Sequence, residues 1–145
     1  MAARMVRAWH RDPRLHAAER SGRRPLLVPV PTTPGRLRVR GYNQARVLAE
    51  TLGDAVGSRL VDALVRPGGG TSQIDLLPGE RRANVDEAFS MNDGRTDQVR
   101  DRDVVLVDDV LTTGATASAA ARTLERGGAR SVRLLTFARS LPDPS

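Results

Sequence analysis

Short aliphatic runs recur along the chain at intervals that suit the strands of one sheet. Each run is rich in Val and Leu, as expected of strands that are buried on both faces. The runs occupy residues 26–28, 60–65, 103–107 and 131–137. We therefore predict buried strands at these places, and the clearest of them, 103–107, ends at Asp108 and Asp109.

Between the runs, apolar residues at helical spacing predict two amphipathic helices. The first begins at Asn43, a suitable N-cap, and reaches Val56 before Gly57 ends it. The second includes residues 117–124 and ends at the glycine pair 127–128. A weaker pattern in residues 1–19 indicates a leading helix that is interrupted at Pro13.

The remaining segments are rich in Pro, Gly and charged residues. We expect loops at 32–42 and 66–80, a helical turn at 80–86 and a turn at 92–97. The order of strands and helices predicts a single α/β domain over residues 1–145, with a parallel sheet flanked by helices. The place of residues 1–24 in this domain stays open. In such folds ligands bind at the carboxyl ends of the strands.

All basic charge comes from arginine, because the sequence contains no lysine. This excludes a P-loop lysine and a Schiff-base lysine, and the absence of cysteine excludes disulfides and thiolate zinc sites within this chain. The net charge of +6 favours anionic partners, either phosphorylated metabolites or nucleic acid, although a solvated arginine-rich surface explains it equally well. No apolar run is long enough to span a bilayer, so we expect no membrane partner and a cytoplasmic location.

Residues 104–116 combine an apolar strand, two carboxylates, a hydroxyl-rich turn and the start of a helix. At a strand end Asp108 and Asp109 can both reach the vicinal hydroxyls of one ribose. The N–H groups of the turn, at a helix N-terminus, suit a phosphate, and Gly114 lets the backbone curl around it. The pattern predicts a ribose 5-phosphate site. The alternative, an acidic strand end before a capped helix with no ligand, stays open.

This segment resembles the phosphoribosyl pyrophosphate signature of type I phosphoribosyltransferases, in which apolar residues precede a pair of acids and a Thr-Thr/Ser-Gly turn. A second block, Pro29-Val30-Pro31 followed by 36–44, is similar to a segment of the competence protein F (ComF) family. A third block, with Gln73, Leu76, Arg81, Asn84 and Ala88-Phe89, has the spacing of that family too. The resemblance implies a type I phosphoribosyltransferase-like fold.

The resemblance also implies roles for individual residues. Asp108 and Asp109 would hold the ribose and orient Mg²⁺, and one of them, with Asp109 favoured, would act as base toward the acceptor. Arg38 and Arg40 would bind the diphosphate, and Arg66 and Gln73 would belong to a flexible loop that closes over the substrate. The 5-phosphate would be held by Thr112, Thr113, Gly114, Ala115 and Thr116. The substrate would be phosphoribosyl pyrophosphate, with an unknown acceptor.

A rival interpretation is a non-catalytic accessory protein in DNA uptake that binds single-stranded DNA or a competence-machinery partner, or that senses a phosphoribosyl ligand. A homodimer also stays open. The family commonly begins with a cysteine-rich zinc module that this sequence lacks, so a truncated start and a genuinely shorter form are both left open. His10 and His16 have no metal-ligand partner at suitable spacing, and we expect surface or structural roles for them.

Overall fold

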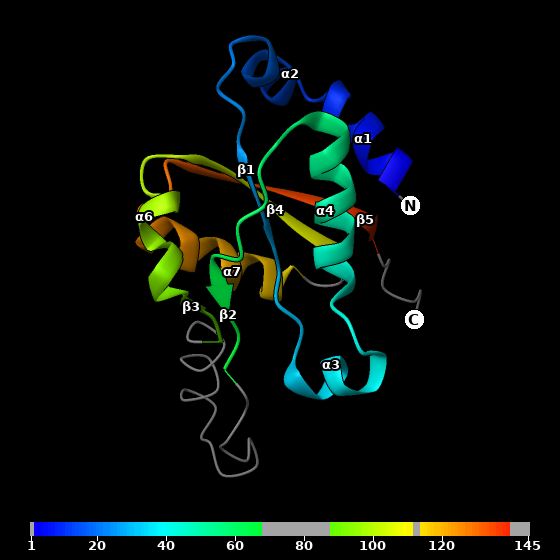
Figure 1. Ribbon diagram of the computed structural model, residues 1–145, viewed down its shortest axis with the longest axis vertical. Helices are drawn as coiled ribbons and strands as arrows, with labels where there is room; N and C mark the ends of the chain where they lie inside the picture. The colour runs from blue at the N-terminus through cyan, green and yellow to red at the C-terminus, as the bar shows by residue number, and fades with distance from the viewer. Residues whose placement is uncertain (1, 68–87, 112–113, 140–145) are drawn as a thin grey trace, which may run out of the picture.

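The computed structural model describes residues 2–67, 88–111 and 114–139. In this part of the chain, helices lie on both faces of a parallel three-stranded sheet (Figure 1). Strand β4 (Asp103–Leu111) is central and pairs in parallel with β1 (Leu26–Pro29) and with β5 (Ser131–Arg139). The predicted α/β architecture with a parallel sheet is confirmed.

The two faces of the sheet are buried against different helices, because side chains alternate along each strand. Leu26 and Leu106 point into one core, on the side of α7 (Ala115–Arg126). Leu27 and Val105 point into the other core, which is covered by α1 (Ala2–Arg11) and α4 (Gln44–Val56). Because both faces are covered, the strands are continuous aliphatic runs rather than alternating ones.

The predicted helix boundaries are confirmed by the backbone. The side chain of Asn43 accepts a hydrogen bond from the backbone N–H of Ala45, and α4 ends at Gly57, whose φ is 71°. The leading segment is helical and breaks before Pro13, where α2 (Pro13–Arg20) begins. Asp12 caps α2 by accepting from the N–H of Arg14 and of Leu15, at 2.9 and 3.3 Å.

The prediction of a loop over 32–42 is wrong, because this segment contains the helix α3 (Pro34–Arg40). The side chain of Thr33 accepts from the N–H of Arg36, Pro34 occupies the first turn, and Gly41 closes the helix with φ 79°. Proline at the start and glycine just past the end are helix-boundary signals. Because the segment is rich in proline, glycine and arginine, the sequence favoured a loop instead.

The predicted strand at 60–65 is divided between two sheets. Leu60 forms a single parallel bridge with Leu27 beside β1. Only β2 (Leu64–Val65) is a strand, and it pairs in antiparallel fashion with β3 (Ser90–Met91). This two-stranded ribbon joins the residues on either side of the segment 68–87. That segment lies outside the described residues, and the predicted helical turn at 80–86 falls within it.

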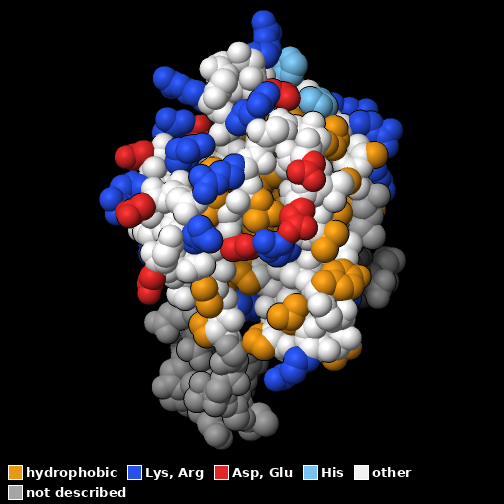
Figure 2. Space-filling view, in the orientation of Figure 1, with side chains coloured by type: hydrophobic (Ala, Val, Ile, Leu, Met, Phe, Trp, Pro, Cys, Tyr) orange, Lys and Arg blue, Asp and Glu red, His pale blue; other side chains and the backbone are white. Residues whose placement is uncertain are grey.

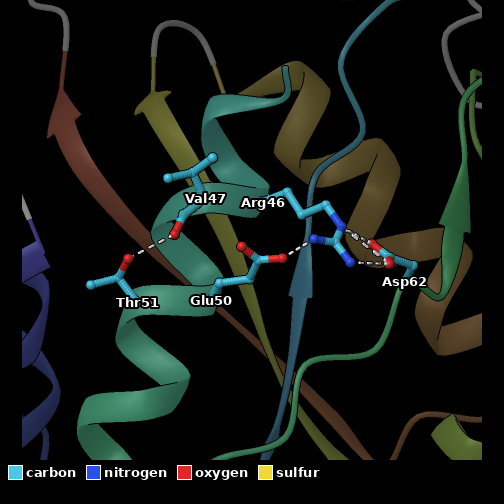
Figure 3. A network of polar contacts seen from close by, with 5 residues as sticks. All are labelled: Arg46, Val47, Glu50, Thr51 and Asp62. Atoms are coloured by element: carbon cyan, nitrogen blue, oxygen red, sulfur yellow. Dashed lines mark hydrogen bonds and ion pairs between the residues drawn. The ribbon is translucent and has the colours of Figure 1, made fainter. Parts of the chain in front are cut away.

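Arg46 holds the segment before β2 against α4 (Figure 3). Its Nε and Nη2 atoms donate to the carboxylate of Asp62 at 3.0–3.3 Å, and Nη1 donates to Glu50 one turn along the helix. On the far side, Asn92 donates from Nδ2 to the carbonyl oxygen of Asp62 at 3.0 Å. The position of β2 and β3 is thus fixed from both sides.

Two smaller expectations are corrected. Strand β4 does not end at Asp108 but continues to Leu111, because β5 is equally long and pairs Asp108 with Thr136. The predicted turn at 92–97 is a 3₁₀ helix, η2 (Asp93–Arg95), followed by the short helix α6 (Thr96–Val99). Among the described residues, no helix has the length and apolar character needed to cross a membrane.

Candidate functional site

Asp108 and Asp109 lie on β4 just beyond the end of β1, whose last residue pairs with Val107. The N–H of Asp109 donates to Oδ1 of Asp108 at 2.9 Å, and the N–H of Val110 donates to Oδ1 of Asp109 at 3.0 Å. Both carboxylates therefore bond to the backbone of the strand itself. This fixes them at the carboxyl edge of the sheet, where a ligand is expected in such folds.

The two acids line a cavity of about 480 Å³ between β4, the segment after β1, α3 and the start of α7. Its size falls within the range of small-molecule sites. Its wall is formed by Val30, Pro31, Thr32, Thr33, Arg36, Arg40, Tyr42, Asn43, Gln44, Arg66, Asp108, Asp109, Val110, Gly114, Thr116 and Ala117. Three arginines thus face two carboxylates across a single cleft.

The pKa of the Asp108 carboxyl group is unusually high. Burial, together with the side chain of Asp109, raises the pKa of Asp108 to about 7, and the positive charge of Arg66 opposes this rise. Desolvation disfavours the charged form of a carboxyl, and a neighbouring acid adds to the effect. Asp108 is therefore poised to exchange a proton near neutral pH, a property typical of functional sites.

Arg66 enters the cleft at the end of β2, and its guanidinium lies over the ring of Phe89 at 5.2 Å from the centroid. Burial and the nearby charge of Arg36 lower the pKa of Arg66, while the carboxylate of Asp108 raises it. The guanidinium is thus a partly buried cation held on an aromatic face, close to one acid and one further arginine. Such a group is well suited to an anionic ligand.

Helix α3 presents only part of its arginine set to the cleft. Arg36 and Arg40 line the cavity, whereas Arg38 does not. Residues four apart share one face of a helix, and the residue midway between them points to the other side. The sequence predicted Arg38 and Arg40 as diphosphate ligands on a loop, and in the helix Arg36 rather than Arg38 accompanies Arg40 at the cleft.

The start of α7 supplies the remaining wall. Gly114 adopts φ 82° as the N-cap residue, and Thr116 and Ala117 line the cavity with it. Ala115 is exposed and is not part of the wall. Three further predicted site residues, Thr112, Thr113 and Gln73, lie outside the described residues.

The segment between β1 and α4 contributes residues that were not predicted as site residues, among them Thr32, Tyr42 and Asn43. Asn43 donates from Nδ2 to the carbonyl oxygen of Val30 at 3.1 Å, which ties the end of β1 to the start of α4. The sequence did contain a signal for these residues, because they follow the predicted strand β1 and therefore lie at the same carboxyl edge of the sheet as the residues after β4.

Comparison with known protein families identifies the family of this chain. A model of the phosphoribosyl transferase domain matches residues 41–143. The chain belongs to this family. Its fold agrees: a purine phosphoribosyltransferase from Pyrococcus horikoshii superposes with a TM-score of 0.51 at 16% identity, over 98% of this chain and 78% of the other.

Within the phosphoribosyl transferase family, the chain is distantly homologous to competence proteins. It is 32% identical to competence protein F of Haemophilus influenzae over 115 residues, which are 79% of this chain and 50% of the relative. It is also 32% identical to the DNA utilization protein YhgH of Escherichia coli O6:H1 over 130 residues, 88% of this chain and 56% of the relative. The chain thus spans about half the length of these relatives.

Proposed function

We propose that this protein binds phosphoribosyl pyrophosphate with Mg²⁺ in the cleft and transfers the phosphoribosyl group to an acceptor. The observation that carries the proposal is the convergence of Asp108 and Asp109, the start of α7 and three arginines on one cavity. These groups match the three parts of that substrate, since carboxylates accept from ribose hydroxyls and arginines bind a diphosphate.

Each part of the substrate has a place in this proposal. The 5-phosphate would lie at the N-terminus of α7, against Gly114 and Thr116 and with Thr112 and Thr113 of the preceding sequence, where N–H groups and the helix dipole favour an anion. The ribose hydroxyls would bond to Asp108 and Asp109. The diphosphate would lie between α3 and β2, against Arg36, Arg40 and Arg66.

The adjacent carboxylates also fit a magnesium ion, which prefers oxygen ligands and usually arrives with substrate phosphates. Asp108 and Asp109 are the candidate residues to hold it or to orient its waters. When bound, Mg²⁺ would neutralise part of the negative charge of the diphosphate.

The reaction would break the bond from C1 of the ribose to the diphosphate oxygen and form one from C1 to the acceptor. Charge builds on the leaving diphosphate, so the arginines of the cleft would contribute by stabilising that charge and by positioning. The proton lost by the acceptor needs a base. The sequence favoured Asp109, but the pKa of Asp108, raised to about 7, makes Asp108 the better candidate.

Turnover is tested by mixing the protein with phosphoribosyl pyrophosphate, Mg²⁺ and a panel of nucleobases and amines, and measuring diphosphate release. We expect release that depends on one acceptor and is lost in Asp108→Asn/Asp109→Asn. If no acceptor supports release above the rate of this double variant, the transferase proposal fails.

A cytoplasmic location and a homodimer are further proposals that rest on the sequence.

A second candidate function, nucleic-acid binding, is favoured by a basic pocket of about 450 Å³ at the opposite, amino-terminal edge of the sheet. It is lined by Gly22, Arg23, Arg24, Gly57, Arg59, Asp101, Arg102, Asp103 and Arg130. Arg130 is paired with Asp103, whereas no ion pair joins Arg24, Arg59 or Arg102 to a carboxylate in the described part of the chain. Figure 2 shows basic side chains, interspersed with acidic ones, over the upper left of the molecule.

A pocket lined by five arginines and only two carboxylates suits the phosphate backbone of a nucleic acid. Two relatives are called competence and DNA utilization proteins, which agrees with such a partner. The test is fluorescence anisotropy with single-stranded DNA at several salt concentrations. Arg24→Gln, Arg59→Gln and Arg102→Gln should each weaken binding and reduce its salt dependence, and Arg95→Gln should not. Equal affinities for all four variants would contradict this candidate.

A further inference from the structure

Helices α1 and α2 bring together three side chains that can bind a metal ion: His10, His16 and Glu19. One ligand atom from each lies within 4.8 Å of the others, and Nδ1 of His10 is 3.6 Å from Oε2 of Glu19. Figure 2 shows the histidine side chains near each other on the surface. The sequence offered no metal-ligand partner for either histidine, but the structure brings His10 of α1 beside His16 and Glu19 of α2.

The cluster lies on two helices that pack against the core. His16 and Glu19 are three residues apart on α2 and so share one face of that helix. Trp9 and Leu15, the neighbours of the two histidines in sequence, are buried in the core, which directs the histidines outward.

The angle between the two helices is fixed at their junction by Asp12. Its carboxylate caps α2 and accepts a hydrogen bond from Nη1 of Arg133 on β5 at 2.6 Å. The backbone that carries the cluster is therefore anchored to the central sheet. A ligand that binds there needs only side-chain adjustment, and little loss of backbone freedom opposes it.

The chemistry of the set points to a borderline transition metal. Imidazole nitrogen suits Zn²⁺ and its neighbours in the periodic table, whereas Mg²⁺ prefers oxygen. Ligand distances of about 2.0–2.2 Å place tetrahedral ligand atoms roughly 3.4 Å apart. The 3.6 Å pair is already close to this separation, and exposed fractions of 48% for His10 and 23% for Glu19 leave the side chains room to move.

We propose that His10, His16 and Glu19 form a Zn²⁺-type site with three protein ligands, which joins α1 to α2 and leaves the fourth position to water or another ligand. The site lies apart from the cleft, because α2 leads into the amino-terminal end of β1 and the cleft lies at the carboxyl ends of the strands (Figure 1). The proposal does not depend on the function of the cleft.

The test is calorimetric titration of the full chain, produced without a histidine tag, with Zn²⁺. We expect one equivalent to bind, and we expect His10→Ala, His16→Ala and Glu19→Gln each to lower the affinity by about tenfold or more. Glu125→Gln on α7 removes the same charge elsewhere and should bind as the unsubstituted chain does. Asp108→Asn/Asp109→Asn should also keep the site.

Nitrogen-15 NMR of the imidazoles gives a second readout that needs no variant, because Zn²⁺ should shift the ring signals of both His10 and His16. Failure of the unsubstituted chain to take up Zn²⁺ overturns the proposal. So does unchanged affinity in the three ligand variants, or loss of the bound equivalent in the Asp108/Asp109 double variant. Circular dichroism establishes that each variant is folded.

Discussion

Arg66 and Phe89 stand on opposite sides of the segment 68–87 in sequence, yet the guanidinium of Arg66 lies 5.2 Å from the centroid of the Phe89 ring. The pairing of β2 with β3 brings them together. Phe89 is buried in the core against α7, so the contact fixes a cation of the cleft to the packed interior. The position of Arg66 is thus determined by the fold.

Replacing Arg66 by Met keeps much of the side-chain volume and removes the charge. We expect the affinity for phosphoribosyl pyrophosphate to fall by about tenfold or more, since a charged hydrogen bond contributes about 1.5–3 kcal/mol. The pKa of Asp108 should rise further, because the charge of Arg66 opposes its elevation. Calorimetry and NMR measure the two effects. Arg66→Lys keeps the charge, so the pKa of Asp108 in this variant should stay below its value in Arg66→Met. Equal pKa values of Asp108 in the two variants would contradict the account.

The arginines of α3 allow a matched comparison within one helix. Arg36→Gln and Arg40→Gln each remove a cation from the cleft and should weaken binding of phosphoribosyl pyrophosphate by about tenfold. Arg38→Gln removes the same charge at a position that does not line the cleft and should change the affinity by less than about twofold. The comparison is made by calorimetry. A larger loss for Arg38→Gln than for Arg36→Gln would favour the choice made from the sequence.

The elevated pKa of Asp108 predicts a specific titration. In the ligand-free protein without divalent ions, the carboxyl carbon of Asp108 should titrate with a midpoint near pH 7 in carbon-13 NMR. Asp109→Asn should lower this midpoint, because the neighbouring acid raises it. Phosphoribosyl pyrophosphate with Mg²⁺ should lower it as well. A midpoint near pH 4 in the ligand-free protein would contradict the electrostatic description of the cleft.

The same shift predicts how stability depends on pH. The folded protein holds the proton of Asp108 up to about pH 7, whereas the unfolded chain releases it near the ordinary value of 3.8. The unfolded state therefore binds fewer protons between these values, and the contribution of Asp108 to stability falls as the pH rises. Asp108→Asn should match the unsubstituted protein in Tm near pH 4 and exceed it at pH 8. An equal Tm difference at both values would count against the prediction.

Much of the fold could be predicted because it depends on local pattern. Buried parallel strands are aliphatic runs, and Asn43 and Gly57 are boundary residues whose effect is local. The acids at the strand end followed from the rule that ligands bind at that edge. Local pattern did not indicate that Arg36 rather than Arg38 lines the cleft, because this depends on the helical conformation of 34–40, where Pro34 and Gly41 are helix boundaries and not loop residues.

Other features depend on contacts between distant segments, which no local pattern contains. The pairing of Leu60 with Leu27, and the separate ribbon formed by Leu64, follow from the path of the chain around β1. The pKa of Asp108 depends on its burial, and the meeting of His10 with Glu19 depends on the angle between two helices. Such properties are set by tertiary packing.

The backbone at Gly114 gives a further prediction. With φ 82°, an alanine side chain there is strained, so Gly114→Ala should lower stability by about 1 kcal/mol and weaken binding of phosphoribosyl pyrophosphate. Gly94→Ala is the control, because its φ is not positive and a Cβ there meets nothing within 4 Å. Chemical denaturation measures the difference. Equal destabilisation by the two substitutions would show that the conformation of Gly114 does not matter.

The central claim is that the cleft beside Asp108 and Asp109 binds phosphoribosyl pyrophosphate. Isothermal titration calorimetry with this compound, with and without Mg²⁺, tests it most directly. The account predicts saturable binding with one equivalent per chain, tightened by Mg²⁺, and loss of the Mg²⁺ effect in Asp108→Asn/Asp109→Asn. Absence of binding in both conditions, or an unchanged Mg²⁺ effect in the double variant, would contradict it.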